Sequence, residues 1–225
     1  MYLVFFGLGF RAITSSSALG NTAYLTFLTP GIMAFQVVMA GAVGGGILWS
    51  DRRWGMLSQL LVGPFTRLQY LLGIMITSML FGLGGAAVML GVAYLMLGAI
   101  SVPLWAFGVI FGAIVVGSIF FGSLMLFISG LVKSNNAYNS IQILLIFILN
   151  FASTVFYPLT PRLPLALGLL FRANPLTYVA DVVRGAYLNQ LNGSDGLQLL
   201  VLLVEMVVFV VLATRTYMRS DVSFV

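Results

Sequence analysis

Residues 51–67 read Asp-Arg-Arg-Trp-Gly-Met-Leu-Ser-Gln-Leu-Leu-Val-Gly-Pro-Phe-Thr-Arg and lie between two long apolar runs. The chain of 225 residues has only 10 basic and 5 acidic side chains, and four of these charges fall in this stretch. An apolar run of about 20 residues is long enough for an α-helix to cross the hydrocarbon core of a bilayer. The stretch therefore predicts an aqueous loop between two membrane helices, and its charges are expected to contact something in water.

The composition of the whole chain agrees with a lipid environment. Hydrophobic residues make up 61% and charged residues 7% of the sequence, and the mean hydropathy is +1.11. A soluble domain carries about 25% charged residues. A soluble fold of this length could not bury so much apolar surface, so we expect an all-α integral membrane protein.

The residue types that are missing exclude several kinds of chemistry. The sequence has no cysteine and no histidine, which excludes disulfides, thiolate metal sites and histidine-based catalysis. Its one lysine, Lys133, lies in Leu-Val-Lys-Ser without the glycine-rich loop that binds nucleotide phosphates. We therefore expect no cofactor and no enzyme activity, and ATP energy, if used, would come from another chain.

Six apolar segments are predicted. The first, Met1–Phe10, is too short to cross a bilayer. The other five are expected at about 27–49, 68–97, 106–132, 141–157 and 197–214. We expect one transmembrane domain over residues 1–225, a bundle of six helices with an incomplete first helix at an N-terminus that is truncated.

The basic residues predict an orientation. If residues 51–67 are cytoplasmic, the 133–140 loop and the C-terminus are cytoplasmic too. That side then holds Arg52, Arg53, Arg67, Lys133, Arg215 and Arg219, and the other side holds Arg11, Arg162, Arg172 and Arg184. Trp49 and Trp54 would mark the inner interface and Trp105 the outer one. The net charge of +5 is thereby explained without nucleic acid as a partner.

The loop itself can form a short amphipathic helix. The side chains of Trp54, Leu57, Leu60 and Leu61 fall on one helical face, whereas Ser58 and Gln59 point elsewhere. Pro64 is expected to end this helix, because proline has no N–H and clashes with the preceding turn. Periodicity alone leaves open an ordinary interfacial connection.

Three sequence blocks resemble a known family, the type-2 ABC exporter permeases for drugs, lipids and polysaccharides. The first block is Asp51-Arg52-Arg53-x-Gly55-x-Leu57-x-x-Leu60-Leu61-x-x-Pro64-x-x-Arg67, followed by Leu72-Gly73. The second is Leu25-x-Phe27-Leu28-x-Pro30-Gly31-Ile32. The third is Asn174-Pro175-Leu176-Thr177-Tyr178-Val179-Ala180-Asp181-Val182-Val183-Arg184. The blocks stand in the family's order and cover most of the chain.

The resemblance implies a function and partners. Members of the family are six-helix permeases of prokaryotic inner membranes that dimerise, here as a homodimer, and pair with separate ABC ATP-binding subunits. The loop between the second and third helices acts as a coupling helix, and ATP is bound by the partner. Carried over, the residues that contact the ATP-binding subunit would be Arg52, Arg53, Gly55, Leu57, Leu60, Pro64 and Arg67. The chain departs from the family at its start, where the usual amphipathic segment and complete first helix are missing.

Residues 158–196 form the longest predicted connection. Pro158, Pro161 and Pro164 end the preceding helix, and the apolar stretch 163–171 is too short to cross. Asn174 is suited to cap a following helix and Pro175 to its first position. That helix would carry an apolar stripe of Leu176, Val179, Val183 and Tyr187.

Asp181 and Arg184 can form a pair on this helix, and the plain interpretation is a surface pair with a structural role. The resemblance implies that such external helices re-enter the outer leaflet of the membrane.

Glu205 is the one charge inside a predicted span. A carboxylate at this depth is costly unless it faces protein or water, so it is a candidate for the translocation path together with Asn150, which could donate a hydrogen bond to it, and Gln36. The alternative is an interhelical hydrogen bond that only holds the fold together.

Two other functions remain open from the sequence. An ion-coupled secondary transporter would be expected to carry paired intramembrane charges and inverted repeats. A membrane scaffold without transport activity is the other alternative.

Overall fold

The computed structural model describes residues 21–98, 102–132, 134–158 and 164–219, and within these ranges every regular element is a helix. The fold class predicted from the sequence, all-α, is therefore confirmed. The helices are α2 (Asn21–Arg53), α3 (Met56–Val62), α4 (Arg67–Leu97), α5 (Leu104–Leu131), α6 (Asn135–Phe151), α7 (Leu165–Arg172), α8 (Pro175–Tyr187) and α9 (Gly193–Arg219). The predicted segment Met1–Phe10 lies outside the described residues, as do Arg11, Lys133, Pro161 and Arg162.

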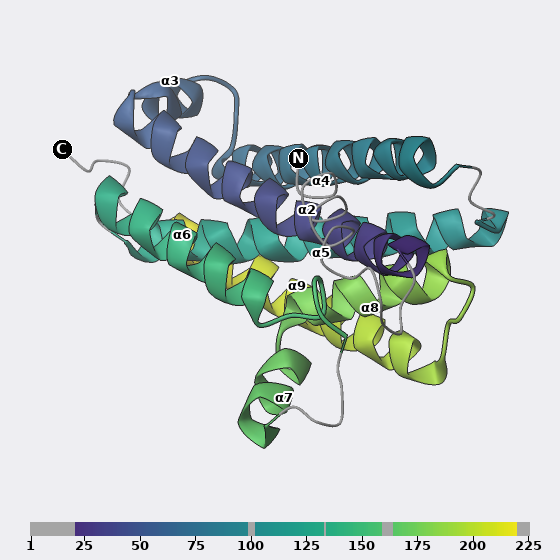
Figure 1. Ribbon diagram of the computed structural model, residues 1–225. Helices are drawn as coiled ribbons and strands as arrows, with labels where there is room; N and C mark the ends of the chain where they lie inside the picture. The colour runs from purple at the N-terminus through teal and green to yellow at the C-terminus, as the bar shows by residue number, and fades with distance from the viewer. Residues whose placement is uncertain (1–20, 99–101, 133, 159–163, 220–225) are drawn as a thin grey trace.

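Four of these helices are long and apolar enough to cross a membrane: α2, α4, α5 and α9. They coincide with four of the five long segments expected from hydropathy and lie side by side in Figure 1. In their most apolar windows, 67% of α2 and 61% of α5 is buried, against 17% of α4 and 11% of α9. Hence α2 and α5 form the centre of the bundle, and α4 and α9 flank them.

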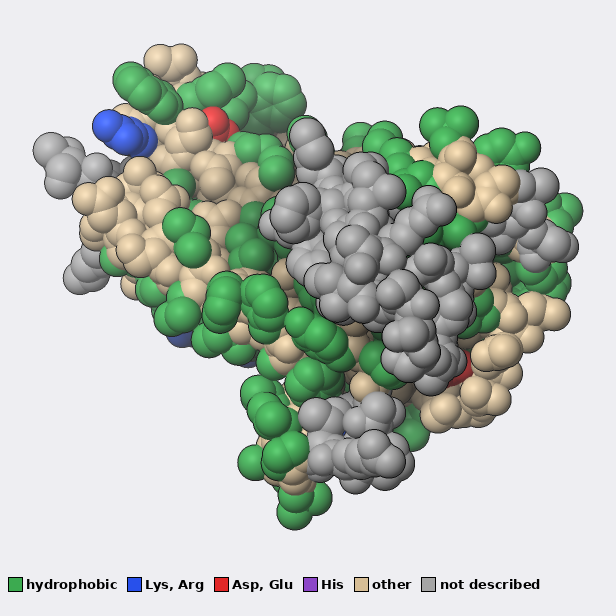
Figure 2. All heavy atoms as spheres, in the orientation of Figure 1, with side chains coloured by type: hydrophobic (Ala, Val, Ile, Leu, Met, Phe, Trp, Pro, Cys, Tyr) green, Lys and Arg blue, Asp and Glu red, His purple; other side chains and the backbone are tan. Residues whose placement is uncertain are grey.

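The flanking helices expose apolar side chains along their length. On the face shown in Figure 2, hydrophobic side chains are spread over the described surface, and charged side chains are few. A soluble monomer rarely exposes contiguous apolar surface of this kind, whereas a helix that faces lipid has no reason to hide it. The exposed apolar side chains on α4 and α9 include Ile76, Leu80, Val88, Leu95, Leu197, Leu200 and Val204.

The predicted bounds of the fifth apolar segment are wrong at both ends. The 133–140 stretch, expected to be a loop, is helical from Asn135, and the helix ends at Phe151 rather than continuing to Tyr157. The reason lies in the chain that follows, because the Asn174 carboxamide donates to the carbonyl oxygens of Leu149 (2.8 Å) and Ala152 (2.7 Å). These carbonyls accept hydrogen bonds from the capping residue of α8 instead of from another turn of α6.

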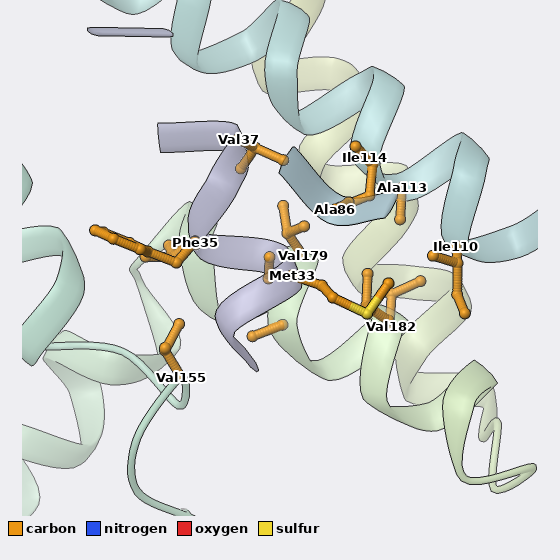
Figure 3. Close-up of a cluster of buried hydrophobic side chains, with 14 of the residues drawn as sticks. Met33, Phe35, Val37, Ala86, Ile110, Ala113, Ile114, Val155, Val179 and Val182 are labelled. Carbon is orange, nitrogen blue, oxygen red and sulfur yellow. The ribbon is translucent and has the colours of Figure 1, made fainter. Parts of the chain in front are cut away.

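The main hydrophobic core lies where α2, α5 and α8 meet. Figure 3 shows Met33 of α2 extending toward Val179 and Val182 of α8, with Ile110 and Ile114 of α5 alongside. Because side chains from five helices fill one interior, including Ala86 of α4 and Leu202 of α9, the short helix α8 is part of the bundle rather than an appendage.

Small residues let the central helices approach closely. A Cβ at Gly41 would lie 2.6 Å from the backbone carbon of Phe121, and one at Gly82 would collide with the Ser118 hydroxyl. Close backbone approach through glycine and serine is the usual way in which membrane helices pack without a hydrophobic driving force. These contacts join α2, α4 and α5 into one tightly packed unit.

Candidate functional site

The C-terminal ends of α2 and α9 and the first turn of α4 meet at one end of the bundle, which we call the basic end. An Arg52 Nη1 group donates to the Ser129 carbonyl of α5 (3.2 Å), and an Arg67 Nη1 group donates to the Met218 carbonyl of α9 (3.2 Å). The grouping of the 51–67 stretch with the C-terminal helix end, predicted from charge, is thereby confirmed. The arginines at this end are Arg52, Arg53, Arg67, Arg215 and Arg219.

Gly55 separates α2 from α3. Its φ of 69° lies in the left-handed region that favours glycine, and its N–H bonds to the Arg52 carbonyl (3.4 Å). The turn redirects the chain, and α3 then runs from Met56 to Val62 before Pro64. The surface helix predicted from periodicity is therefore present.

The predicted start of that helix is wrong. Trp54 lies outside α3 and is 74% exposed, with the Arg53 guanidinium 5.6 Å from the centre of its ring. It does not share the buried face with Leu57, because the left-handed residue between them interrupts the helical period.

The underside of α3 is anchored in a second hydrophobic cluster. Leu57 is only 2% exposed and packs with Leu48 of α2 and with Leu71 and Ile74 of α4. Leu57, predicted as a partner contact, thus packs inward and holds α3 against the bundle. Leu60 lines an open groove of about 340 Å³ between α2, α3 and α4. The side chains that α3 and its flanking turns expose are Trp54, Met56, Ser58, Gln59, Val62 and Pro64.

A polar and aromatic cluster ties the ends of three helices together beside α3. The Tyr70 hydroxyl of α4 donates to the Asp51 carboxylate of α2 (2.6 Å), and its ring stacks on Tyr217 of α9 at 6.0 Å. The Arg52 guanidinium lies 6.0 Å from the same Tyr217 ring. Arg52 is thus turned into the bundle, whereas Arg53 is exposed. Sequence analysis missed Tyr70 and Tyr217, whose only signal was a tyrosine near a helix end.

The opposite end holds a buried polar network around Arg184 of α8. Its guanidinium donates to the carbonyls of Phe27 (3.4 Å) and Thr154 (2.7 Å) and to the Asp181 carboxylate (3.0 Å). It also lies 3.9 Å from the centre of the Phe27 ring. These contacts join α8 to the start of α2 and to the chain after α6.

Asp181 completes the network. It accepts from the Thr154 hydroxyl (2.7 Å) and from Gln198 of α9 (3.5 Å). The interpretation of Asp181 and Arg184 as a surface pair is wrong, because the side chains are 21% and 12% exposed. Burial raises the pKa of the Asp181 carboxyl, while the Thr154 hydrogen bond and the Arg184 charge act in the opposite direction.

The predicted cap, first position and apolar stripe of α8 are confirmed. The Asn174 side chain accepts from the Leu176 N–H (3.0 Å), and Pro175 occupies the first helical position. All members of the predicted apolar stripe are buried: Leu176, Val179, Val183 and Tyr187. The helix α7 precedes α8 and stands apart from the body of the bundle in Figure 1. Its exposed leucines are Leu165, Leu167, Leu169 and Leu170.

The three candidates for a translocation path face different neighbours. Gln36 lies against Gly85 of α4, and Asn150 is 7% exposed beside the capping residue Asn174. The predicted hydrogen bond from Asn150 to Glu205 is not formed. In the described part of the chain, Asn150 Oδ1 and Glu205 Oε2 are buried without a hydrogen-bond partner.

Comparison with known families gives one match. The family model described as "ABC-2 type transporter" matches residues 1–188, a range that contains α2 through α8. No curated protein matches the chain.

Proposed function

The chain belongs to the ABC-2 type transporter family, and on that premise we propose that a separate ATP-binding subunit docks on the exposed side of α3 and drives export. As a member of this family, the protein is a multi-pass membrane permease subunit without an ATPase site of its own. The proposal adds the place where the ATP-binding subunit docks, the direction of transport and the class of cargo.

The proposed docking surface is supported by the way in which α3 packs on the bundle. Its outer side exposes Ser58 and Gln59, with Arg53 and Pro64 exposed next to it. Its inner side is fixed by the fully packed side chain of Leu57. A subunit bound to the outer side would therefore push on a helix that cannot move without its neighbours.

The cluster beside α3 extends this connection to the spans. Through Tyr70, Asp51 and Tyr217, the first turn of α4 is joined to the last turns of α2 and α9. Arg52 adds a hydrogen bond to the end of α5. A displacement of α3 would thus reach all four long helices over one or two contacts, which suits a coupling element.

We further propose that the permease acts in a prokaryotic inner membrane, with the basic end cytoplasmic, and that two copies form the transport unit. The basic residues at that end support the orientation. The exposed apolar side of α6, with Ile143, Leu144 and Phe147, could face lipid or a second copy. The cargo class is amphiphilic: a drug, a lipid or a lipid-linked glycan. Gln36, Asn150 and Glu205 remain candidates for its path.

The test of the docking surface is co-purification with the ABC ATP-binding protein encoded beside this gene. Arg53→Glu should abolish retention of that protein, because it reverses an exposed charge while leaving the contacts of Arg52 intact. Arg172→Glu, the same change at an exposed site near the opposite end, is the matched control and should retain it. Equal retention by both variants, or no binding by the unaltered chain, would reject the proposed function.

A further inference from the structure

A second cavity at the basic end is polar and lies away from the groove under α3. It has a volume of about 220 Å³, which exceeds the share of about 30 Å³ that one water occupies in the liquid. It lies between the end of α2 and the first two turns of α6. The polar and aromatic side chains that line it are Trp49, Ser50, Arg53, Trp54, Asn135 and Asn139.

The lining is rich in hydrogen-bond donors, and none of the lining side chains that the structure describes is acidic. Arg53 contributes a guanidinium, and its one recorded contact in the described part of the chain is the ring of Trp54. Asn135 and Asn139 of α6 contribute carboxamides, each of which can donate two hydrogen bonds. A site with one cationic fork and several neutral donors suits an anion with several oxygens.

The start of α6 adds backbone donors to the same cavity. Its capping residue, Ser134, makes no side-chain hydrogen bond to the first turn. The first N–H groups of a helix lack intrahelical partners and carry the positive end of the helix dipole. The C-terminal end of α2, which carries the negative end of its helix dipole, also borders the cavity. This negative charge is partly offset, because the carbonyls of Ser50 and Arg52 accept from the N–H groups of Trp54 (3.0 Å) and Gly55 (3.4 Å).

An independent observation at the cavity wall points to a missing acceptor. Trp49 is 8% exposed, and its indole N–H is buried without a partner among the described residues. Tyr138 of α6, whose ring centre lies 5.9 Å from that of Trp49, is not part of the lining, and its hydroxyl lies against Gly45 of α2. Buried donors are nearly always satisfied, so the indole N–H of Trp49 is a donor of a lining residue that lacks an acceptor.

We propose that this cavity binds a phosphate group, supplied either by the headgroup of an anionic lipid or by free phosphate. Arg53 and the start of α6 hold the phosphate oxygens, and Asn135 and Asn139 close the site from the side of α6. The two tryptophans beside it stand where aromatic side chains meet lipid headgroups in membrane proteins. Phosphate binding at this site needs no ATP-binding subunit, so its test does not depend on the proposed function.

Tryptophan emission tests the site directly in the purified full-length chain in neutral detergent. The chain has three tryptophans, and Trp105→Phe leaves only Trp49 and Trp54, both at the cavity. The probes are inorganic phosphate, dihexanoyl phosphatidylglycerol and, as a phosphate-free control, dihexanoyl glycerol. We expect a saturable change in emission with at least one phosphate probe and none with the phosphate-free lipid.

The variants separate a built site from general attraction to a basic surface. Arg53→Gln should weaken binding roughly tenfold or more, as expected for the loss of a charged hydrogen-bond partner. Asn135→Leu combined with Asn139→Leu should weaken it as well without changing the net charge. Arg219→Gln removes the same charge at the same end of the bundle, outside the cavity, and should leave the dissociation constant within about twofold.

Each result of the binding experiments either supports or overturns the proposal. Saturation by inorganic phosphate alone would assign the site to free phosphate, and saturation only by the phosphatidylglycerol would assign it to a lipid headgroup; both support the proposal. An equal response to dihexanoyl glycerol would overturn it, as would no saturable response to either phosphate probe. Equal weakening by Arg219→Gln would also overturn it. Monodisperse elution of each variant checks that the bundle has folded.

Discussion

Arg184→Met should destabilise the bundle more than any change at an exposed arginine. The substitution removes three hydrogen bonds, which the guanidinium donates to the carbonyls of Phe27 and Thr154 and to the Asp181 carboxylate. It leaves Asp181, 21% exposed, with only the Thr154 hydroxyl and the Gln198 carboxamide as donors. It also removes the cation held over the Phe27 ring.

The size of the effect follows from burial. Removing one partner of a fully buried ion pair costs about 3–5 kcal/mol, and the partial exposure of this pair reduces that to about 2–4 kcal/mol. For a chain of this length, each kcal/mol shifts the melting temperature by about 2–4 °C, so we expect a loss of about 5–15 °C. The assay is size-exclusion chromatography with fluorescence detection after heating in detergent.

Two controls make the test specific. Arg172→Met removes an exposed arginine at the last position of α7 and should shift the melting temperature by less than about 2 °C. Adding Asp181→Leu to Arg184→Met should recover at least about 1 kcal/mol, because no uncompensated carboxylate then remains. If Arg184→Met melts together with the Arg172→Met control, the network does not hold α8 in place and the reasoning fails.

Three further predictions concern α3 and the spans. Gly55→Ala should cost about 1–2 kcal/mol of stability, because the residue has a left-handed φ of 69°, although a Cβ there meets no close atom. The control Gly84→Ala, at an unhindered position within α4, should be neutral or stabilising, and equal melting temperatures of the two variants would contradict the strain argument. Leu57→Ala should cost about 2–5 kcal/mol of stability and loosen α3, whereas Val62→Ala, at a position 90% exposed on the same helix, should cost little. Limited proteolysis of the 51–67 stretch measures both variants, and equal cleavage would contradict the role of Leu57 in holding α3. Glu205→Gln should change cargo-stimulated ATP hydrolysis of the reconstituted complex and leave assembly intact, and unchanged stimulation would remove Glu205 from the path.

Hydropathy and local sequence signals predicted much of the fold because they report local physics. The apolar runs located α2, α4, α5 and α9, since lipid demands a continuous apolar surface over a fixed length. Asn174 and Pro175 marked the start of α8, because capping depends on residues adjacent in the chain. For the same reason, Pro64 bounded α3 correctly on its C-terminal side.

Features that depend on distant contacts could not be predicted. The end of α6 at Phe151 is set by Asn174, which lies more than twenty residues further along the chain. The burial of Asp181 and Arg184 depends on carbonyls from α2 and from the segment after α6. Periodicity wrongly placed Trp54 on the buried face of α3, because the pattern carries no information on the left-handed turn at Gly55.

The same distinction applies to the candidate docking surface. The charge and helical period of residues 51–67 indicated a surface helix, but not which of its side chains face outward. The structure separates the buried anchor Leu57 from the exposed Arg53, and it turns Arg52 toward Tyr217. The docking experiments therefore use Arg53 and the outer side of α3.

Site-specific cross-linking tests docking on α3 most directly. The chain has no cysteine, so Gln59→Cys places a unique thiol on the exposed side of α3, and Leu165→Cys places one on α7, 80% exposed in the parent. Each variant is mixed with the ATP-binding subunit and treated with a short thiol-to-amine cross-linker. We predict a covalent adduct from Gln59→Cys that ATP alters in yield, and none from Leu165→Cys. An adduct of equal yield from both positions, or none from Gln59→Cys while the subunit still co-purifies, would contradict docking on α3.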